Sequence, residues 1–223
     1  MKTAQARLRA NSQTRREKQK EELRAQILRA AGEEFSAHGY DGFSLRRVAE
    51  RIGYSPTTIY LYFRGKDDLL LETVRDGFAH FDAQIERAAT HSDPSRRLCE
   101  IGLAYLRFGL ENPALYRLMF LQRADFFVLR LTGIGTPDEQ QNALEAQNAP
   151  HHRVAAQDFL VKTIEEGIRR GEFRAQNPIF QADALWAAMH GLVSLAIGPL
   201  MSPEHAQEIA PQLLEILIDG LKP

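Results

Sequence analysis

Hydroxyl and aromatic side chains gather between residues 55 and 62 of this 223-residue chain. Hydroxyl groups donate and accept hydrogen bonds, and the edges and methyl groups of DNA bases offer partners for polar and apolar groups alike. Ser55 followed by Pro56 is a typical helix start, so these side chains would project from one short helix. The chemistry open to them is recognition of base edges in a DNA groove. The side chains expected to face the bases are Thr57, Thr58 and Tyr60.

A preceding helix would hold this one in place. Its apolar positions recur at helical spacing, at Leu45, Val48, Ala49 and Ile52. Ser44 suits its N-cap, and Gly53 suits the turn that ends it. Ile59 and Phe63, four residues apart, would pin the second helix onto the first. This pattern is typical of a helix-turn-helix, but two helices around a turn also occur in all-α proteins that bind no DNA.

The segment from about Glu22 to Leu70 resembles the DNA-binding domain of the TetR (tetracycline-repressor) family. The matched positions are Ile27-Leu28-Arg29-Ala30-Ala31, Phe35, His38 to Leu45, Val48-Ala49, Gly53, Ser55, Ile59-Tyr60, Tyr62-Phe63 and Lys66-Asp67-Asp68-Leu69. The resemblance implies an all-α fold, with an N-terminal three-helix helix-turn-helix domain joined to a larger C-terminal helical domain for effector binding and dimerisation. Leu61 departs from the pattern, because family members often carry a phosphate-contacting His there.

Charge is spread unevenly along the chain. Residues 1–70 hold 14 Lys and Arg against 9 Asp and Glu, whereas residues 71–223 hold 14 against 20. A basic domain on an acidic body is typical of a protein that docks on nucleic acid by one end. Residues 1–15 are expected to form a basic, flexible arm, either a solvated tail or a segment that orders along DNA. The other candidate DNA contacts are Arg15, Arg16, Ser44, Arg46, Arg47, Ser55, Pro56, Tyr62 and Lys66, mostly to phosphates.

The remaining sequence predicts further helices and no strands. The DNA-binding domain is expected over residues 16–65 and the effector-binding and dimerisation domain over residues 66–223. The expected helices cover about residues 16–38, 66–90, 93–112, 113–120, 151–170, 177–198 and 204–221. Residues 132–150 are rich in Gly, Pro, Gln and Asn, which favours a loop with room for a short helix.

Aromatic residues are frequent in the expected larger domain, where the same residue types would form either a core or the lining of an effector cavity. The candidate lining residues are Phe81, Tyr105, Phe108, Tyr116, Phe120, Phe159, Trp186 and His190. Residues 186–191 resemble the Trp-His-Gly (WHG) signature of one C-terminal subclass of the TetR family. His190 is expected to donate to a nearby carbonyl as a buried histidine, with ligand contact as the alternative.

This lining predicts a small, mostly apolar effector. Four arginines nearby would favour an acidic group on that effector, unless each belongs to a solvated face: Arg107, Arg117, Arg123 and Arg130.

The last two helices are expected to pair two chains. The helix ending near residue 198 is apolar almost all round, so one small domain could cover only part of it. A second copy would cover the rest and form a two-fold homodimer. The candidate interface residues are Leu192, Leu195, Leu213 and Leu217.

Other classes of function find little support. No Gly-x-Ser-x-Gly, P-loop or Rossmann glycine pattern is present, and adjacent His151 and His152 would point about 100° apart on a helix. An enzyme is therefore not expected, nor a cofactor or a metal. Cys99 is the single cysteine, which excludes an internal disulfide and favours packing over a redox role. With no apolar secretory segment and no membrane span, a cytoplasmic protein is expected.

The residues and the resemblance together predict a transcriptional regulator that binds a pseudo-palindromic double-stranded DNA operator as a dimer and is released by a small-molecule effector. An adaptor of the same fold that binds DNA or protein without an effector is the alternative. Whether such a regulator represses or activates depends on the position of its operator, which the chain does not contain.

Overall fold

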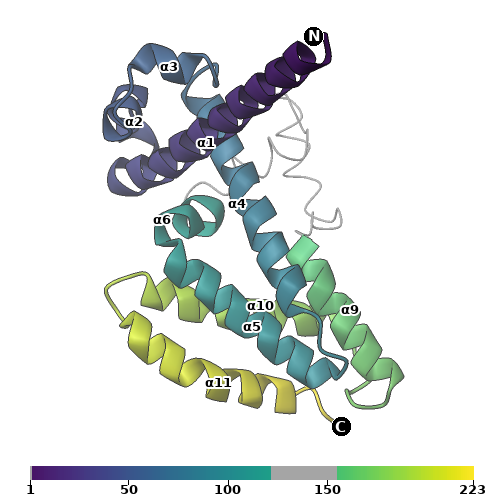
Figure 1. Cartoon of the computed structure of the whole chain (residues 1–223). Helices are drawn as coiled ribbons and strands as arrows, with labels where there is room; N and C mark the ends of the chain where they lie inside the picture. The colour runs from purple at the N-terminus through teal and green to yellow at the C-terminus, as the bar shows by residue number, and fades with distance from the viewer. Residues whose placement is uncertain (1, 122–154) are drawn as a thin grey trace, which may run out of the picture.

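The computed structural model describes the backbone of residues 2–121 and 155–223, and the side chains of residues 14–121 and 156–223. Every regular element in this part of the chain is a helix. In Figure 1 the first three helices form a small unit, and α4 leads from it into a larger helical body. The expected all-α fold of two helical parts is confirmed for the described residues.

The small unit comprises α1 (Lys2–Gly42), α2 (Leu45–Arg51) and α3 (Pro56–Tyr60). The connecting helix is α4 (Lys66–Ala88). The body contains α5 (Pro94–Glu111), α6 (Pro113–Tyr116), a π-helical turn η1 (Arg117–Leu121), α9 (Ala155–Arg169), α10 (Pro178–Ala196) and α11 (Pro203–Asp219). The expected loop over residues 132–150 lies outside the described residues.

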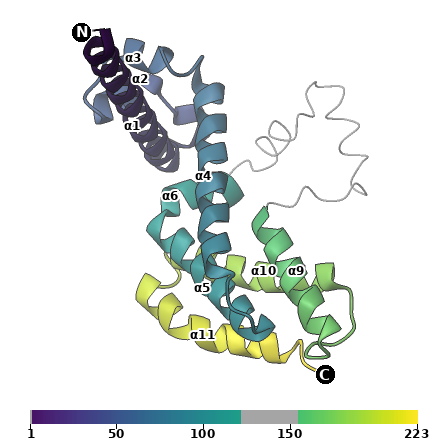
Figure 2. The same cartoon turned by 45° about the vertical axis from the view of Figure 1, so that its right-hand side comes forward.

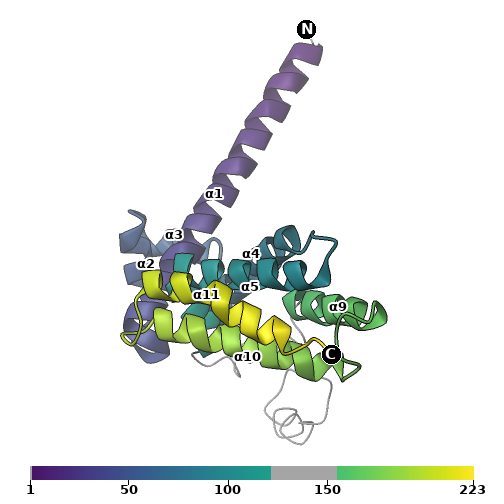
Figure 3. The ribbon, with the colours of Figure 1, turned by 90° about the horizontal axis from the view of Figure 1, so that it is seen from below.

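Helix α1 begins earlier than expected. It starts at Lys2 rather than near residue 16, and its N-terminal part projects beyond the body in Figure 3. No Gly or Pro occurs before Gly32, and the segment is rich in Ala, Arg, Lys, Gln and Glu, which are all good helix formers. The basic N-terminal segment is thus a continuation of α1. Gly39 has a φ of 64° and breaks the regular helix near the expected end.

Local capping explains where α5 and α10 start. Asp93 accepts a hydrogen bond from the Arg96 N–H at 2.9 Å, and Asn177 accepts one from the Ile179 N–H at 3.0 Å. Each of these caps is followed by proline at the first helical position, which suits a residue that has no N–H to satisfy. The capping residue and proline together set the starts of α5 and α10 close to the expected positions.

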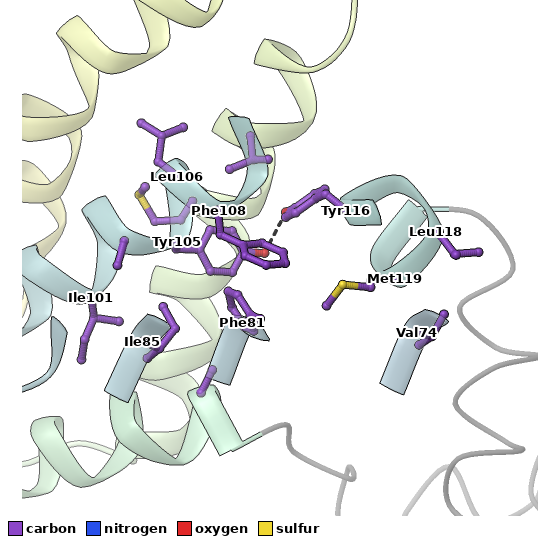
Figure 4. Packing of buried hydrophobic residues seen from close by; sticks show 14 of the residues in the cluster. Val74, Phe81, Ile85, Ile101, Tyr105, Leu106, Phe108, Tyr116, Leu118 and Met119 are labelled. Atoms are coloured by element: carbon purple, nitrogen blue, oxygen red, sulfur yellow. Dashed lines mark hydrogen bonds between the residues drawn. The ribbon is translucent and has the colours of Figure 1, made fainter. Parts of the chain in front are cut away.

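Helix α5 lies at the centre of the larger body. It contacts α4, α9, α10 and α11, and Figure 2 shows α9, α10 and α11 arranged around it. The buried residues along its length include Leu98, Ile101, Tyr105 and Phe108. Figure 4 shows aromatic and aliphatic side chains of α4, α5 and the α6–η1 segment meeting in one core. Burial of this shared core holds α4 against the body.

Candidate DNA-binding surface and aromatic cluster

Helix α3 presents polar and aromatic side chains to solvent while its core side is fixed. Ile59 is fully buried, and Phe63 is nearly so. Thr57 is exposed, Thr58 is half-buried with its Oγ1 3.1 Å from Ser55 Oγ, and Tyr60 is 58% exposed. The three side chains predicted to read bases therefore come from one turn of helix and need no movement of the core to reach a partner.

The turn before α3 has the geometry that a helix-turn-helix requires. Ser44 Oγ accepts a hydrogen bond from the Arg47 N–H at 3.4 Å and caps α2. Gly53 has a φ of 75°, a conformation that most L side chains avoid. Val48 and Ala49 of α2 are fully buried beneath α3. These features orient α3 with its exposed side away from α1.

The arginines of α2 differ in what they contact. The side chain of Arg46 is 78% exposed, and its Nε donates to Glu50 one turn away at 2.8 Å. Arg47 Nε donates to Glu34 Oε1 on α1 at 2.6 Å, and its Nη2 donates to the Gly42 carbonyl. Arg47 thus ties α2 to α1, so its guanidinium has less freedom for a phosphate than Arg46 has. Arg15 and Arg16 are exposed on α1.

The carboxylate of Glu34 is the main feature of this domain that the sequence did not reveal. Its side chain is 0% exposed, although it lies in a helix whose neighbouring Glu33 is exposed. Glu34 Oε1 lies 3.2 Å from His38 Nδ1, while Oε2 has no hydrogen-bond partner and lies 3.9 Å from Arg51 Nη2. A buried carboxylate opposite an arginine holds two helices in register at an electrostatic cost.

Lys66, a predicted phosphate contact, lies against Tyr40 of α1. Its ammonium group donates to the Tyr40 carbonyl and lies 3.9 Å from the Tyr40 ring centroid. Asp67 and Asp68 occupy the first turn of α4, so carboxylates already complement the positive end of this helix. Lys66 therefore joins α1 to α4, and its phosphate contact stays a prediction.

Tyr54 is a further exposed aromatic residue that was not among the predicted contacts. It lies in the turn before α3 and is 45% exposed. Tyr62, which was among them, is half-buried and lies against the Phe63 ring. In the sequence both tyrosines could equally have been core residues.

In the larger body, most of the predicted pocket residues form one aromatic cluster. Its rings come from α4, α5, α6, η1 and α10, and most neighbouring ring centroids lie 4.8–6.4 Å apart. Its members are Phe81, Tyr105, Phe108, Tyr116, Phe120, Trp186 and His190. Phe159 of α9 packs half-buried against the same core.

Three polar groups meet inside this aromatic cluster. The phenolic oxygens of Tyr105 and Tyr116 lie 2.7 Å apart, as the dashed line in Figure 4 marks. His190 Nδ1 lies 2.6 Å from the Tyr116 oxygen and 3.3 Å from the Tyr105 oxygen. The predicted partner of a buried His190 was a carbonyl, and the partners of its Nδ1 are instead two phenols.

Burial keeps all three groups uncharged near neutral pH. Loss of solvation raises the pKa of Tyr105 to about 12 and raises the pKa of Tyr116 further. Loss of solvation also lowers the pKa of His190 from its ordinary value of 6.5. A neutral imidazole can accept a hydrogen bond from a phenol O–H at Nδ1. The cluster therefore offers neutral hydrogen-bonding groups in an apolar setting.

The two nearby arginines that the structure describes do not add charge to the aromatic cluster. Arg107 is exposed on α5, and Arg117 donates to Ser36 and to the Ile197 carbonyl. Arg123 and Arg130 lie outside the described residues. The preference for an acidic effector consequently has no support among the arginines that the structure describes.

The aromatic cluster is closely packed. A cavity of about 20 Å³ adjoins Tyr105 and Trp186, with Leu98, Met189 and Leu214 among its other lining residues. This volume is about that of a single water site. An effector that entered here would have to separate side chains that now touch.

Two family models match the chain. The model for bacterial regulatory proteins of the tetR family covers residues 27–73, and the model for the tetracyclin repressor-like C-terminal domain covers residues 98–221, which is more than half of the chain. The chain belongs to the TetR family. The Trp-His-Gly subclass suggested by residues 186–191 stays a prediction.

Curated relatives of this TetR-family chain are transcriptional regulators. HbdR of Aromatoleum sp. (strain CIB) is 36% identical over 88 residues, which cover 38% of each protein. The fatty acid metabolism regulator protein of Bacillus subtilis (strain 168) is 33% identical over 69 residues, which cover 31% of this chain and 36% of that protein. The chain thus aligns with less than two fifths of the length of these relatives.

Solved structures resemble the whole fold. A protein of unknown function from Rhodococcus sp. RHA1 has a TM-score of 0.66 at 25% identity, covering 90% of this chain and 96% of that one. FadR of Bacillus subtilis in complex with stearoyl-CoA has a TM-score of 0.65 at 18% identity, covering 88% and 98%. At such identities the likeness shows the TetR fold.

One side of α10 in this TetR-family chain is open to solvent. Residues on that side are spaced as one helical stripe: Phe180, Ala184, Ala187, Ala188, Gly191 and Leu195. Leu195 is 40% exposed, whereas Leu192 is only 4% exposed because it faces the chain's own core. Leu192 is therefore a core residue, which corrects its prediction as an interface residue. Leu213 and Leu217 of α11 are half-buried.

Within residues 2–121 and 155–223, no helix is both long enough and apolar enough to cross a membrane. The side chains described there include no group of three His, Cys, Asp or Glu placed to hold a metal ion.

Proposed function

We propose that this chain is a DNA-binding transcriptional repressor that acts as a homodimer and leaves its operator when a small effector binds. The observation that carries the proposal is the exposed side of α3, where Thr57 and Tyr60 stand on a turn fixed by buried Ile59. Such a surface can enter a major groove without rearrangement. Membership of a family of bacterial regulatory proteins supports the same function.

Contacts to DNA divide into two kinds. Thr57, Thr58 and Tyr60 are proposed to meet base edges and thymine methyls, because they lie on the exposed turn of α3. Arg46 and the exposed α1 arginines, Arg15 and Arg16, are proposed to meet phosphates. Arg47 and Lys66 contribute mainly by holding α2 and α4 against α1.

The effector is proposed to be a small, mostly apolar and uncharged compound with one hydroxyl or carbonyl group. Tyr105, Tyr116 and His190 supply neutral hydrogen bonds, and aromatic rings surround them. Stearoyl-CoA, the ligand of FadR, carries several phosphate charges, and the described aromatic cluster has no cationic side chain to receive them. The described aromatic cluster therefore suits, at most, the apolar part of a ligand such as stearoyl-CoA.

Effector entry would loosen DNA binding through α4. Phe81 of α4 touches Tyr105 and Phe120 in the aromatic cluster, while Lys66 at the other end of α4 contacts Tyr40 of the DNA-binding domain. Displacement of Phe81 would also move Lys66 relative to Tyr40, because Phe81 and Lys66 both belong to α4. In a dimer this movement changes the spacing of the two α3 helices and lowers operator affinity.

The experiment that tests the proposed function is selection of bound sequences from a pool of random DNA duplexes, with the purified full-length protein. Recovery of a palindrome with half-sites about one helical turn apart is expected. Retention without sequence preference that is lost at modest salt would overturn the proposal and favour the adaptor alternative. A regulator of this kind would act in the cytoplasm, where the DNA is.

A further inference from the structure

Arg117 joins three parts of the molecule with one side chain. It is the first residue of η1 and directly follows Tyr116. Its Nη1 lies 3.4 Å from Ser36 Oγ on α1, and its Nη2 donates to the carbonyl of Ile197, which ends α10. The guanidinium thus links the DNA-binding domain to the end of α10, and the chain joins Arg117 directly to Tyr116 of the aromatic cluster.

The segment that carries Arg117 is also tightly held from the other side. Leu115 and Met119 pack against Gly77 of α4 so closely that a Cβ at Gly77 would lie 2.7 Å from Met119 Sδ and 2.9 Å from Leu115 Cδ1. No side chain larger than hydrogen fits there without displacement. Close packing at Gly77 therefore keeps the α6–η1 segment in contact with α4.

The π-helical geometry of η1 favours movement of the whole turn over Arg117–Leu121 as one unit. The π-helical turn over Arg117–Leu121 interrupts the α-helical ladder, and such turns are less stable than α-helix. Tyr116 and Phe120 place their rings side by side in the aromatic cluster, with centroids 4.8 Å apart, while Arg117 points out of the cluster towards α1. A shift of this turn would change both the ring contacts in the aromatic cluster and the contact of Arg117 with Ser36.

We propose that Arg117 is a positioning residue that couples the aromatic cluster to the DNA-binding domain. The proposal rests on the proposed function and identifies a direct route from the effector region to α1, in addition to α4. When DNA fixes α1, Ser36 and Arg117 transmit that constraint to Tyr116 and to His190 beyond it. By linkage, displacement of Tyr116 by an effector weakens DNA binding through the same contacts.

The chemistry of arginine fits this role. Its planar guanidinium presents several N–H donors in a fixed fork, so it can bind the Ser36 hydroxyl and the Ile197 carbonyl at the same time. The Ile197 carbonyl lies at the C-terminal end of α10, where the helix dipole favours a positive charge. Lysine would concentrate its charge at one point and lose the geometry that joins the two acceptors.

The chain contains its own reporter for this coupling. Trp186 is the single tryptophan in the sequence, and its ring centroid lies 5.3 Å from that of His190. It belongs to α10 in the larger body, away from the exposed side of α3. A change of its fluorescence on DNA binding would therefore report movement transmitted to the aromatic cluster.

The test uses full-length protein and the operator recovered from the random DNA pool. Operator binding is followed by fluorescence anisotropy of labelled DNA, and Trp186 emission is recorded in the same titration. For the unmodified protein, saturation with operator is expected to change Trp186 emission. Arg117→Gln should alter operator affinity by less than about threefold and reduce the Trp186 response by roughly half or more. Arg107→Gln, an equal loss of charge on the exposed side of α5, should leave both unchanged.

Ser36→Ala provides a second variant in case Arg117→Gln folds poorly. It removes the acceptor on α1 with little change in volume, and it should also reduce the Trp186 response. If operator binding did not change the Trp186 emission of the unmodified protein, the proposed coupling would be wrong. A full Trp186 response in Ser36→Ala or in a folded Arg117→Gln would overturn it as well. Failure to recover any operator would instead count against the proposed function.

Discussion

His190 Nδ1 lies 2.6 Å from the phenolic oxygen of Tyr116, and this contact joins α10 to α6 inside a ring of aromatic side chains. With a neutral imidazole, Tyr116 donates and His190 accepts. Protonation of Nδ1 would replace this acceptor by a second donor and place a charge among aromatic rings. The contact therefore depends on His190 staying neutral.

Acidification should destabilise the protein through His190. Burial lowers the pKa of His190 below its ordinary value of 6.5, so the unfolded chain takes up this proton at a higher pH than the folded chain. The free energy of unfolding should be largest above pH 6.5 and should fall as the pH drops towards the lowered pKa. The measurement is thermal or urea unfolding of wild type and His190→Asn at pH 7.5 and 5.5.

His190→Asn should show a smaller loss of stability between these two pH values than wild type does. His205→Asn is the matched control, because His205 is exposed on α11 and lies 3.6 Å from Glu208. Equal pH dependence in wild type and His190→Asn would contradict the assignment of this proton to His190.

Tyr60 should determine which DNA sequence is bound. Its side chain is 58% exposed, so Tyr60→Ala should leave the unfolding temperature nearly unchanged. Loss of a base contact should weaken binding to the selected operator by about 1–3 kcal/mol and leave binding to random DNA nearly the same. Titration of both duplexes with Tyr60→Ala measures the difference.

Arg46→Ala should weaken DNA binding without changing which sequence is preferred, in contrast to Tyr60→Ala. The exposed guanidinium of Arg46 is proposed to meet a phosphate, so its loss should weaken operator and random DNA alike. The slope of log K against log salt should also fall by about 0.9 in magnitude. If Tyr60→Ala weakened both duplexes equally, α3 would not be the element that reads the sequence.

The sequence predicted those elements whose signals are local. Asp93-Pro94 and Asn177-Pro178 marked helix starts because capping and proline geometry depend only on neighbouring residues. The apolar spacing around Val48 and Ile59 predicted the packing of α2 on α3 for the same reason. The start of α1 differs from the sequence prediction, because the basic residues at the N-terminus resemble a charged arm although they also favour helix.

Contacts between distant parts of the chain could not be predicted in this way. Glu34 looks like any other surface carboxylate in its helix, and only the fold places it opposite Arg47. Leu192 and Leu195 are three residues apart, and small differences in helix rotation decide that one is core and the other exposed. Whether aromatic residues enclose a cavity or fill it depends on packing, which composition does not specify.

Glu34→Gln should destabilise the DNA-binding domain. The change removes the charge that Arg47 pairs with at 2.6 Å, and the site on the Glu34 side is fully enclosed. A loss of roughly 2–3 kcal/mol in the free energy of unfolding is expected, below the value for a fully buried pair because Arg47 is partly exposed. Urea unfolding measures it.

Glu33→Gln is the control for this change. Glu33 pairs with Arg51 at 3.1 Å, but its side chain is 57% exposed, so its loss should cost less than about 1 kcal/mol. If the two variants were equally stable, the Glu34–Arg47 pair would not be what holds α2 on α1.

Ile216→Glu should convert the proposed dimer into a monomer. Ile216 is 70% exposed and Phe180 is 72% exposed, and both line a groove of about 600 Å³ between α10 and α11 together with Ala184 and Leu217. Large exposed apolar side chains beside small ones suit close packing of the same helices from a second chain. A glutamate there would bury an unpaired charge in the proposed interface, which is strongly unfavourable.

The measurement is molar mass by light scattering at micromolar concentration. The unmodified protein should give the mass of two chains, and Ile216→Glu the mass of one. Gln207→Glu introduces the same charge on the opposite side of α11 and should leave the dimer intact. Because a repressor must place two α3 helices in successive grooves, Ile216→Glu should also lose most of its operator affinity while keeping its fold. A stable monomer of the unmodified protein would contradict the pairing, and an intact dimer of Ile216→Glu would place the interface elsewhere.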